Sequence, residues 1–142
     1  MKAVIVTGSV GAGKTTLALG LSKKLGYKYI DVNKVITNYG ASEGYDRARK
    51  CRIIDVKKLS AALVKEIKEF KNNKVKGIII DSHLSHYIPK SYIDLCIAAK
   101  CDLKVLCKRL SKRKYSKLKI RENLDAEIFN VCIEEAREKG HN

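Results

Sequence analysis

The chain has 142 residues, and its 30 Lys and Arg against 15 Asp and Glu give a formal net charge of +15 at pH 7. Hydrophobic residues make up 45% of the chain, an ordinary value for globular proteins that argues against a mainly disordered state. The length is that of one domain, so we expect a single domain over residues 1–142, and the unbalanced cations favour polyanionic partners over a merely solvated surface.

The first elements predicted along the chain are a strand, a helix and a second strand. Residues 2–7 read KAVIVT, which predicts a short buried strand. Residues 14–25 carry three leucines at helical spacing, which predicts an amphipathic helix, and Gly26 suits its C-terminal end. A short strand is expected at 27–31.

The middle of the chain is predicted to hold an irregular insertion and a long helix. Residues 32–54 contain two glycines and a basic run, and we expect no regular structure there. Asp55 is the candidate N-cap of a helix over residues 55–71, and the apolar stretch 77–81 predicts another strand.

The remaining elements complete an alternating pattern. We expect a strand at 91–99, a helix over residues 102–113 that begins at Asp102, and one amphipathic helix over residues 122–138. Strands that alternate with helices predict an α/β domain built on a parallel sheet.

Residues 8–15 read GSVGAGKT, the phosphate-binding loop pattern, and lie between a predicted strand and a predicted helix. In this pattern backbone amides and the positive end of the helix surround a phosphate, while Lys14 reaches the β- and γ-phosphates and Thr15 binds Mg²⁺. The order of the glycines argues against a dinucleotide fold. The expected nucleotide contacts are Gly11, Ala12, Gly13, Lys14, Thr15 and Thr16.

A second group of candidate residues follows the strand at 77–81. Asp81 ends this strand, where phosphate-loop enzymes place an acid that holds Mg²⁺. His83 lies two residues on and is a candidate to orient a water or a phosphate, with a plain hydrogen-bonded histidine as the alternative. We interpret His86 as a loop residue, although these three side chains together also suggest a metal triad.

Residues 103–121 contain nine Lys or Arg and no acid. A basic segment that folds over a triphosphate would tolerate this density of charge. Because guanidinium groups bind phosphate with two hydrogen bonds, Arg109 and Arg113 are the candidate catalytic arginines. RNA binding and a solvated surface remain the alternatives.

The motifs GSVGAGKTT, EGYD, IIDSHLSHYIP, KRLSKRKY and KIRENLDAEIF, in this order, resemble the adenylate kinase isoenzyme 6 family. The resemblance implies a three-layer P-loop nucleoside triphosphate hydrolase fold with a monophosphate-binding segment near residues 31–54 and a lid near residues 112–122. It also implies ATP and Mg²⁺ as cofactors, combined kinase and NTPase activity, and a role in small ribosomal subunit maturation. The implied partners are the ribosomal protein uS11 and the pre-30S subunit with its rRNA.

The same resemblance ties Asp81 and His83 to Mg²⁺ and hydrolysis, and it makes Arg113 the nucleotide-contacting arginine of the lid. The chain departs from the family at Lys114, where relatives have glycine, and this change is expected to stiffen the lid. It also has Thr37 where some relatives have arginine. The basic residues that would substitute for this arginine are Lys34, Arg47 and Arg49. Relatives continue past the last helix, so a fifth strand is expected to be missing.

The function expected from these residues is transfer of the γ-phosphoryl group of MgATP to AMP or another nucleoside monophosphate. A nucleotide-switched ribosome assembly ATPase is the first alternative, and a sugar or metabolite kinase of related fold is the second.

The cysteines and the apolar runs bear on where the protein works. Five cysteines without a C-x-x-C pair argue against a zinc site and predict free thiols, which suit a reducing cytoplasmic location. No apolar run reaches the ~20 residues that span a membrane, so no membrane partner is expected.

Overall fold

A computed structural model describes residues 1–48 and 51–142. Its main sheet has four parallel strands in the order β2-β5-β1-β6, which confirms the predicted α/β class. These strands are β1 (Lys2–Gly8), β2 (Lys28–Ile30), β5 (Gly77–Asp81) and β6 (Leu95–Ala99).

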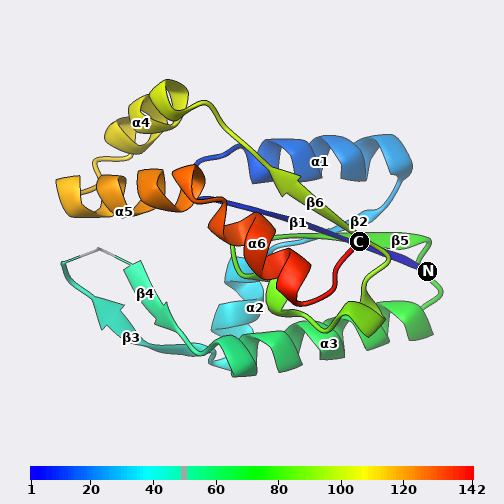
Figure 1. Cartoon of the computed structure of the whole chain (residues 1–142). Helices are drawn as coiled ribbons and strands as arrows, with labels where there is room; N and C mark the ends of the chain where they lie inside the picture. The colour runs from blue at the N-terminus through cyan, green and yellow to red at the C-terminus, as the bar shows by residue number, and fades with distance from the viewer. Residues whose placement is uncertain (49–50) are drawn as a thin grey trace.

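The helices cover both faces of this sheet (Figure 1). They are α1 (Lys14–Leu25), α2 (Val32–Tyr39), α3 (Val56–Asn72), α4 (Leu103–Lys112), α5 (Lys117–Ile128) and α6 (Val131–Glu138), with short 3-10 turns η1 (Ser85–Tyr87) and η2 (Lys90–Tyr92). Among the helices of the described residues, none combines the length and the apolar character needed to cross a membrane.

Strand β1 shows how the sequence forms three layers. Its side chains alternate between the two faces, so Ile5 packs in the cluster formed with α2 and α3, whereas Val4 and Val6 pack with Ala18 of α1. Since both faces are covered, the strand is apolar without alternation, as expected for a buried parallel strand. The three-layer P-loop fold predicted from the sequence is therefore confirmed.

The helix ends that depend on local chemistry lie where the sequence predicts them. The Asp55 side chain accepts a hydrogen bond from the Lys58 amide at the start of α3, and Asp102 accepts one from the Lys104 amide at the start of α4. Gly26 ends α1 in the left-handed conformation, with φ of 67°.

The prediction that residues 32–54 are irregular is wrong. They form α2 and an antiparallel hairpin of β3 (Ser42–Asp46) and β4 (Cys51–Ile54), while Arg49 lies outside the described residues. Asp31 caps α2 by accepting a hydrogen bond from the Asn33 amide. The hairpin is mostly exposed, so its residues carry no apolar alternation that would reveal it.

The single helix predicted over residues 122–138 is also wrong, because the chain turns between α5 and α6. Asn130 has φ of 53°, a left-handed conformation that asparagine tolerates better than most residues and that ends a helix. The Lys100 side chain holds this turn, since its ammonium lies 2.6 Å from the buried Glu127 carboxylate and also contacts the Asn130 amide oxygen. A distant lysine therefore decides where α5 ends.

Two smaller predictions also need correction. The strand predicted at 91–99 begins only at Leu95, because η2 occupies its first residues. In α1 the predicted leucine face is wrong, since Leu17 and Leu25 are each 39% exposed and only Ala18 is buried. The small alanine side chain lets α1 lie close against β1.

Lys114, between α4 and α5, offers a test of backbone strain. It has φ of 56°, a left-handed conformation that costs a residue with a Cβ about 1 kcal/mol and costs glycine almost nothing. We expect Lys114→Gly to raise the free energy of unfolding by up to about 1 kcal/mol in urea titrations. The matched control Lys108→Gly, at an exposed position in the middle of α4, should lower it by about 0.5–1 kcal/mol. An equal decrease in the free energy of unfolding of both variants would contradict the proposal that Lys114 is strained.

Candidate active site

A cavity of about 1210 Å³ lies at the carboxyl ends of β1 and β5. Figure 1 shows that α4 and α5 project above this end of the sheet and that the β3–β4 hairpin projects below it. The structure brings all of the predicted site residues to the lining of this one cavity. These residues are Gly11, Ala12, Gly13, Lys14, Thr15, Thr16, Asp81, His83, Arg109 and Arg113.

The phosphate loop depends on glycine at both of its ends. A Cβ at Gly8 would lie 2.6 Å from the carbonyl oxygen of Ala99 in β6, and Gly13 has φ of 95°. The Lys14 ammonium donates a 2.9 Å hydrogen bond to the carbonyl of Ser9, so it lies back over the loop. Burial lowers the pKa of Lys14, and a phosphate beside it would raise this pKa again.

Tyr29 connects the two predicted metal ligands, and the sequence analysis missed it. Its hydroxyl donates a 2.9 Å hydrogen bond to Asp81 Oδ2 and is also a hydrogen-bond partner of the Thr15 hydroxyl. Burial and the carboxylate of Asp81 raise the pKa of Tyr29 to about 12. The tyrosine therefore stays protonated and holds both oxygen ligands at the mouth of the loop.

The two histidines after β5 differ in their surroundings. His83 is exposed and lines the cavity, and desolvation by the surrounding atoms, together with the charge of Lys14, lowers its pKa to about 4. His86 was interpreted as a loop residue without a role, but it lies in η1, is only 1% exposed and has a partner at each ring nitrogen. Among the described residues no group of three His, Cys, Asp or Glu is placed to hold a metal ion, which argues against the triad with Asp81.

Arg109 and Arg113 reach the cavity from the end of α4. The Arg109 guanidinium donates a 3.0 Å hydrogen bond to the carbonyl of Gly11, so it braces the phosphate loop from a distant element. Arg113 is the C-cap of α4 and lies at the start of the segment predicted as a lid. Further along this segment the Lys119 ammonium lies 3.7 Å from the centre of the Tyr115 ring.

Arg52, on β4, is a cavity residue that sequence reasoning did not single out. Its guanidinium donates hydrogen bonds of 3.0 Å to the Thr37 hydroxyl and 3.4 Å to Asn33 Oδ1. Of the described substitutes expected for the missing arginine, neither Lys34 nor Arg47 lines the cavity. Arg52 reaches the cavity because it lies on the β3–β4 hairpin, and the sequence analysis did not predict this hairpin.

The residues present fit a nucleotide phosphate with its metal. The phosphate loop lines the cavity at the start of α1, where backbone amides and the positive end of the helix suit a phosphate. Asp81 and Thr15 offer a carboxylate and a hydroxyl oxygen, which are the hard ligands that Mg²⁺ prefers.

A phosphate loop at the edge of a parallel sheet, opposite arginines from a separate helix, defines the class of P-loop phosphotransferases. A family model described as an AAA domain matches residues 4–130. An adenylate kinase isoenzyme 6 homolog from Caenorhabditis elegans is 34% identical over 135 residues, which are 95% of this chain and 72% of that protein. The homolog from Dictyostelium discoideum is 34% identical over 94% of this chain and 73% of its own length.

The chain belongs to the adenylate kinase isoenzyme 6 family, and it is a phosphotransferase. Among solved structures, a shikimate kinase from Acinetobacter baumannii is similar with a TM-score of 0.60 and 14% identity, covering 99% of this chain and 81% of its own. A sugar kinase from a Janibacter species has a TM-score of 0.59 and 17% identity, covering 89% of this chain and 78% of its own. At such identities these similarities show the fold alone.

Tyr29 gives a direct test of the arrangement around Asp81. In Tyr29→Phe the Asp81 carboxylate loses a hydrogen bond from a neutral donor, which we expect to lower the free energy of unfolding by about 1–2 kcal/mol. The measurement is urea unfolding without nucleotide, and Tyr27→Phe is the control because no described residue receives a hydrogen bond from that hydroxyl. Equal stability of the two variants would show that the contact contributes nothing.

Proposed function

We propose that this protein is a nucleoside monophosphate kinase that transfers the γ-phosphoryl group of MgATP to AMP or another nucleoside monophosphate. The observation that carries the proposal is a single cavity with cationic side chains at two separate ends. One end is the phosphate loop with Lys14, and the other is the guanidinium of Arg52 on the hairpin. A donor and an acceptor need such a pair of ends, whereas hydrolysis needs only the first.

In this proposal each residue acts on charge or position. The loop amides from Gly11 to Thr16 and the Lys14 ammonium hold the donor phosphates. Arg109 and Arg113 offset the charge that develops on the migrating group, an effect worth about 10³–10⁵ in rate for comparable arginines. Asp81 and Thr15 would hold Mg²⁺, which would neutralise part of the phosphate charge.

Two segments on opposite sides of the cavity would recognise the two nucleotides. Residues 31–54, which contain α2 and the hairpin, would bind the acceptor, with Arg52 in the role that Thr37 cannot fill. Residues 112–122 would act as the lid over the donor. Since neutral His83 lines the cavity, it would orient a water when no acceptor is bound, which gives the ATPase activity.

A nucleotide-switched ribosome assembly ATPase is the second candidate, and the net charge of +15 favours it. In that case hydrolysis would drive release from the ribosomal protein uS11 or from pre-30S rRNA, and monophosphate transfer would be incidental.

All five cysteines fall among the described residues and are free thiols, which supports the proposal of a cytoplasmic location.

Incubation with ADP and Mg²⁺ separates these two candidates. We expect AMP and ATP to appear in equal amounts, measured by chromatography, because a monophosphate kinase runs in both directions. Omission of Mg²⁺ and replacement of Lys14 by Ala should each abolish the reaction. Phosphate release from ATP that is unaffected by AMP, without conversion of ADP, would favour the switch.

Arg52→Ala tests the acceptor end of the cavity. We expect KM for AMP to rise about tenfold or more, because a charge-assisted hydrogen bond to phosphate is lost, while KM for ATP stays within about twofold. Steady-state kinetics with each nucleotide varied in turn provide the measurement. Arg137→Ala is the control, since Arg137 pairs with Glu134 on the exposed surface of α6, outside the cavity lining. An unchanged KM for AMP in Arg52→Ala would remove Arg52 from the acceptor site.

A further inference from the structure

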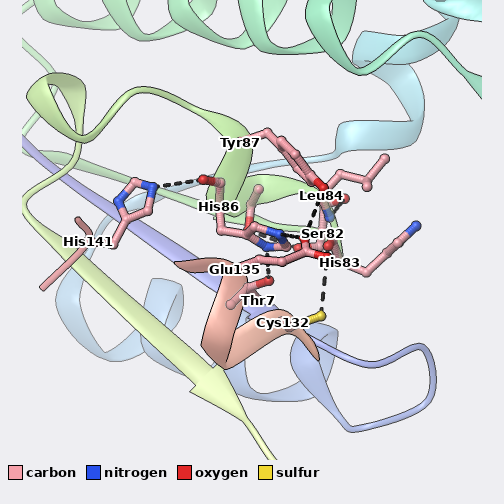
Figure 2. Close-up of polar contacts among 10 residues, drawn as sticks. Thr7, Ser82, His83, Leu84, His86, Tyr87, Cys132, Glu135 and His141 are labelled. Atoms are coloured by element: carbon pink, nitrogen blue, oxygen red, sulfur yellow. Dashed lines mark hydrogen bonds and ion pairs between the residues drawn. The ribbon is translucent and has the colours of Figure 1, made fainter. Parts of the chain in front are cut away.

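A network of polar side chains, centred on the buried Thr7 and His86, lies behind the phosphate loop, outside the cavity lining (Figure 2). The His86 ring is 1% exposed and touches a partner at each nitrogen. Its Nδ1 lies 2.7 Å from the Thr7 hydroxyl, and its Nε2 lies 2.7 Å from Glu135 Oε2. These hydrogen bonds thus join β1, the segment after β5, and α6, three parts of the protein that are far apart in the sequence.

The partners determine which atom donates and which accepts in each hydrogen bond of this network. Tyr87 donates a 2.9 Å hydrogen bond to the same Glu135 oxygen. Burial alone would raise the pKa of Glu135, but the hydrogen bonds from His86 and Tyr87 lower it overall, so the carboxylate is ionised and only accepts. The Nε2 atom of His86 must therefore carry a proton. Since burial also lowers the pKa of His86, the ring is neutral, and its bare Nδ1 accepts the Thr7 hydroxyl proton.

The polar network lies against two segments that carry cavity residues, the phosphate loop and residues 82–86. Thr7 directly precedes Gly8, the first glycine of the phosphate loop. The amide of Ser82 and the hydroxyl of Ser85 both donate to the carbonyl of Val6, so residues 82–86 are bonded to the end of β1. His83, which lines the cavity, belongs to this bonded segment.

Helix α6 holds the same segment from the other side. Cys132 and Glu135 lie three residues apart, on one face of the helix. The Cys132 thiol approaches the carbonyl of His83 at 3.9 Å, while Glu135 holds His86. The His141 ring contacts the carbonyl of His86 at 2.8 Å, just beyond the end of α6. Two histidines and the end of β1 are therefore tied to one helix.

We infer that Thr7, His86 and Glu135 are positioning residues for the phosphotransferase reaction. Glu135 sets the orientation of the His86 ring, and the ring in turn fixes the Thr7 hydroxyl and the segment that carries His83. The inference rests on the proposed function of the cavity, because the groups it positions are those proposed to act on ATP. A satisfied buried network of this kind holds its members in one geometry, and misplacing reacting groups by a fraction of an ångström lowers the rate more than the binding.

Paired variants test this inference through kinetics. We expect Thr7→Val and Glu135→Ala to lower kcat for ATP turnover about tenfold or more, with KM for ATP within about threefold. Thr7→Ser and Glu135→Gln, which keep the hydrogen-bonding oxygen, should recover most of kcat. Glu134→Ala is the matched control on α6, since Glu134 pairs only with exposed Arg137 among the contacts described. Thr7→Val and Glu135→Ala proteins that melt earlier but keep the wild-type kcat would overturn the inference.

Imidazole ¹H–¹⁵N spectra of the nucleotide-free protein give a readout that does not depend on activity. The chain has three histidines, so each ring can be assigned by substitution. We expect His86 to carry its proton on Nε2, and Thr7→Val and Glu135→Ala to shift the signals of both His86 and His83. Glu134→Ala should shift neither ring.

A proton on Nδ1 of His86, or a His83 signal that ignores Thr7→Val and Glu135→Ala, would overturn the inference even in an active enzyme. A wild-type protein that neither binds nor turns over MgATP would instead refute the proposed function. In that case the His83 and His86 signals still decide whether this polar network sets the geometry of the segment.

Discussion

The site depends on the parallel pairing of β1 with its two neighbours. In this register Val6 lies opposite Asp81 of β5, and Gly8 lies opposite Ala99 of β6. The phosphate loop and the acid therefore leave the sheet at the same edge, as expected for ligand sites of parallel α/β folds. A shift of the strand register by one residue would turn Asp81 to the other face of the sheet. The packing of the buried strands therefore determines where Asp81 lies relative to the phosphate loop.

The apolar core makes this register strict, and polar side chains extend it to the cavity. Ile5 and the three isoleucines of β5 are completely buried, which leaves little freedom for the strands to slide. Beyond the last apolar residues, Tyr29 joins Asp81 to Thr15, and His86 joins β1 to α6. Among the described residues no buried side-chain nitrogen or oxygen lacks a hydrogen-bond partner, so these polar links are stable in a water-poor setting.

The distribution of charge connects the stability of the empty protein to its function. The segment 103–121 carries nine cations, and three of them, Arg109, Arg113 and Lys119, line the cavity that also holds Lys14 and the positive end of α1. Such groups repel one another, and the contact that holds Arg109 beside the loop uses the Gly11 carbonyl, which carries no full negative charge to offset this repulsion. A bound polyphosphate would relieve this repulsion. The same cations would also attract RNA, so charge alone does not separate the two proposed functions.

The sequence by itself determined the features that depend on neighbours along the chain. The phosphate loop, the capping residues Asp55 and Asp102 and the strand before Asp81 are local patterns, and all lie where they were predicted. Only the tertiary structure decided which distant groups meet: Tyr29 beside Asp81, Arg52 beside Thr37, and Glu135 beside His86. The break at Asn130 belongs with these, because Lys100 of another element holds it. Such pairs arise when the packing of the sheet and helices brings remote residues together, and no local periodicity encodes that packing.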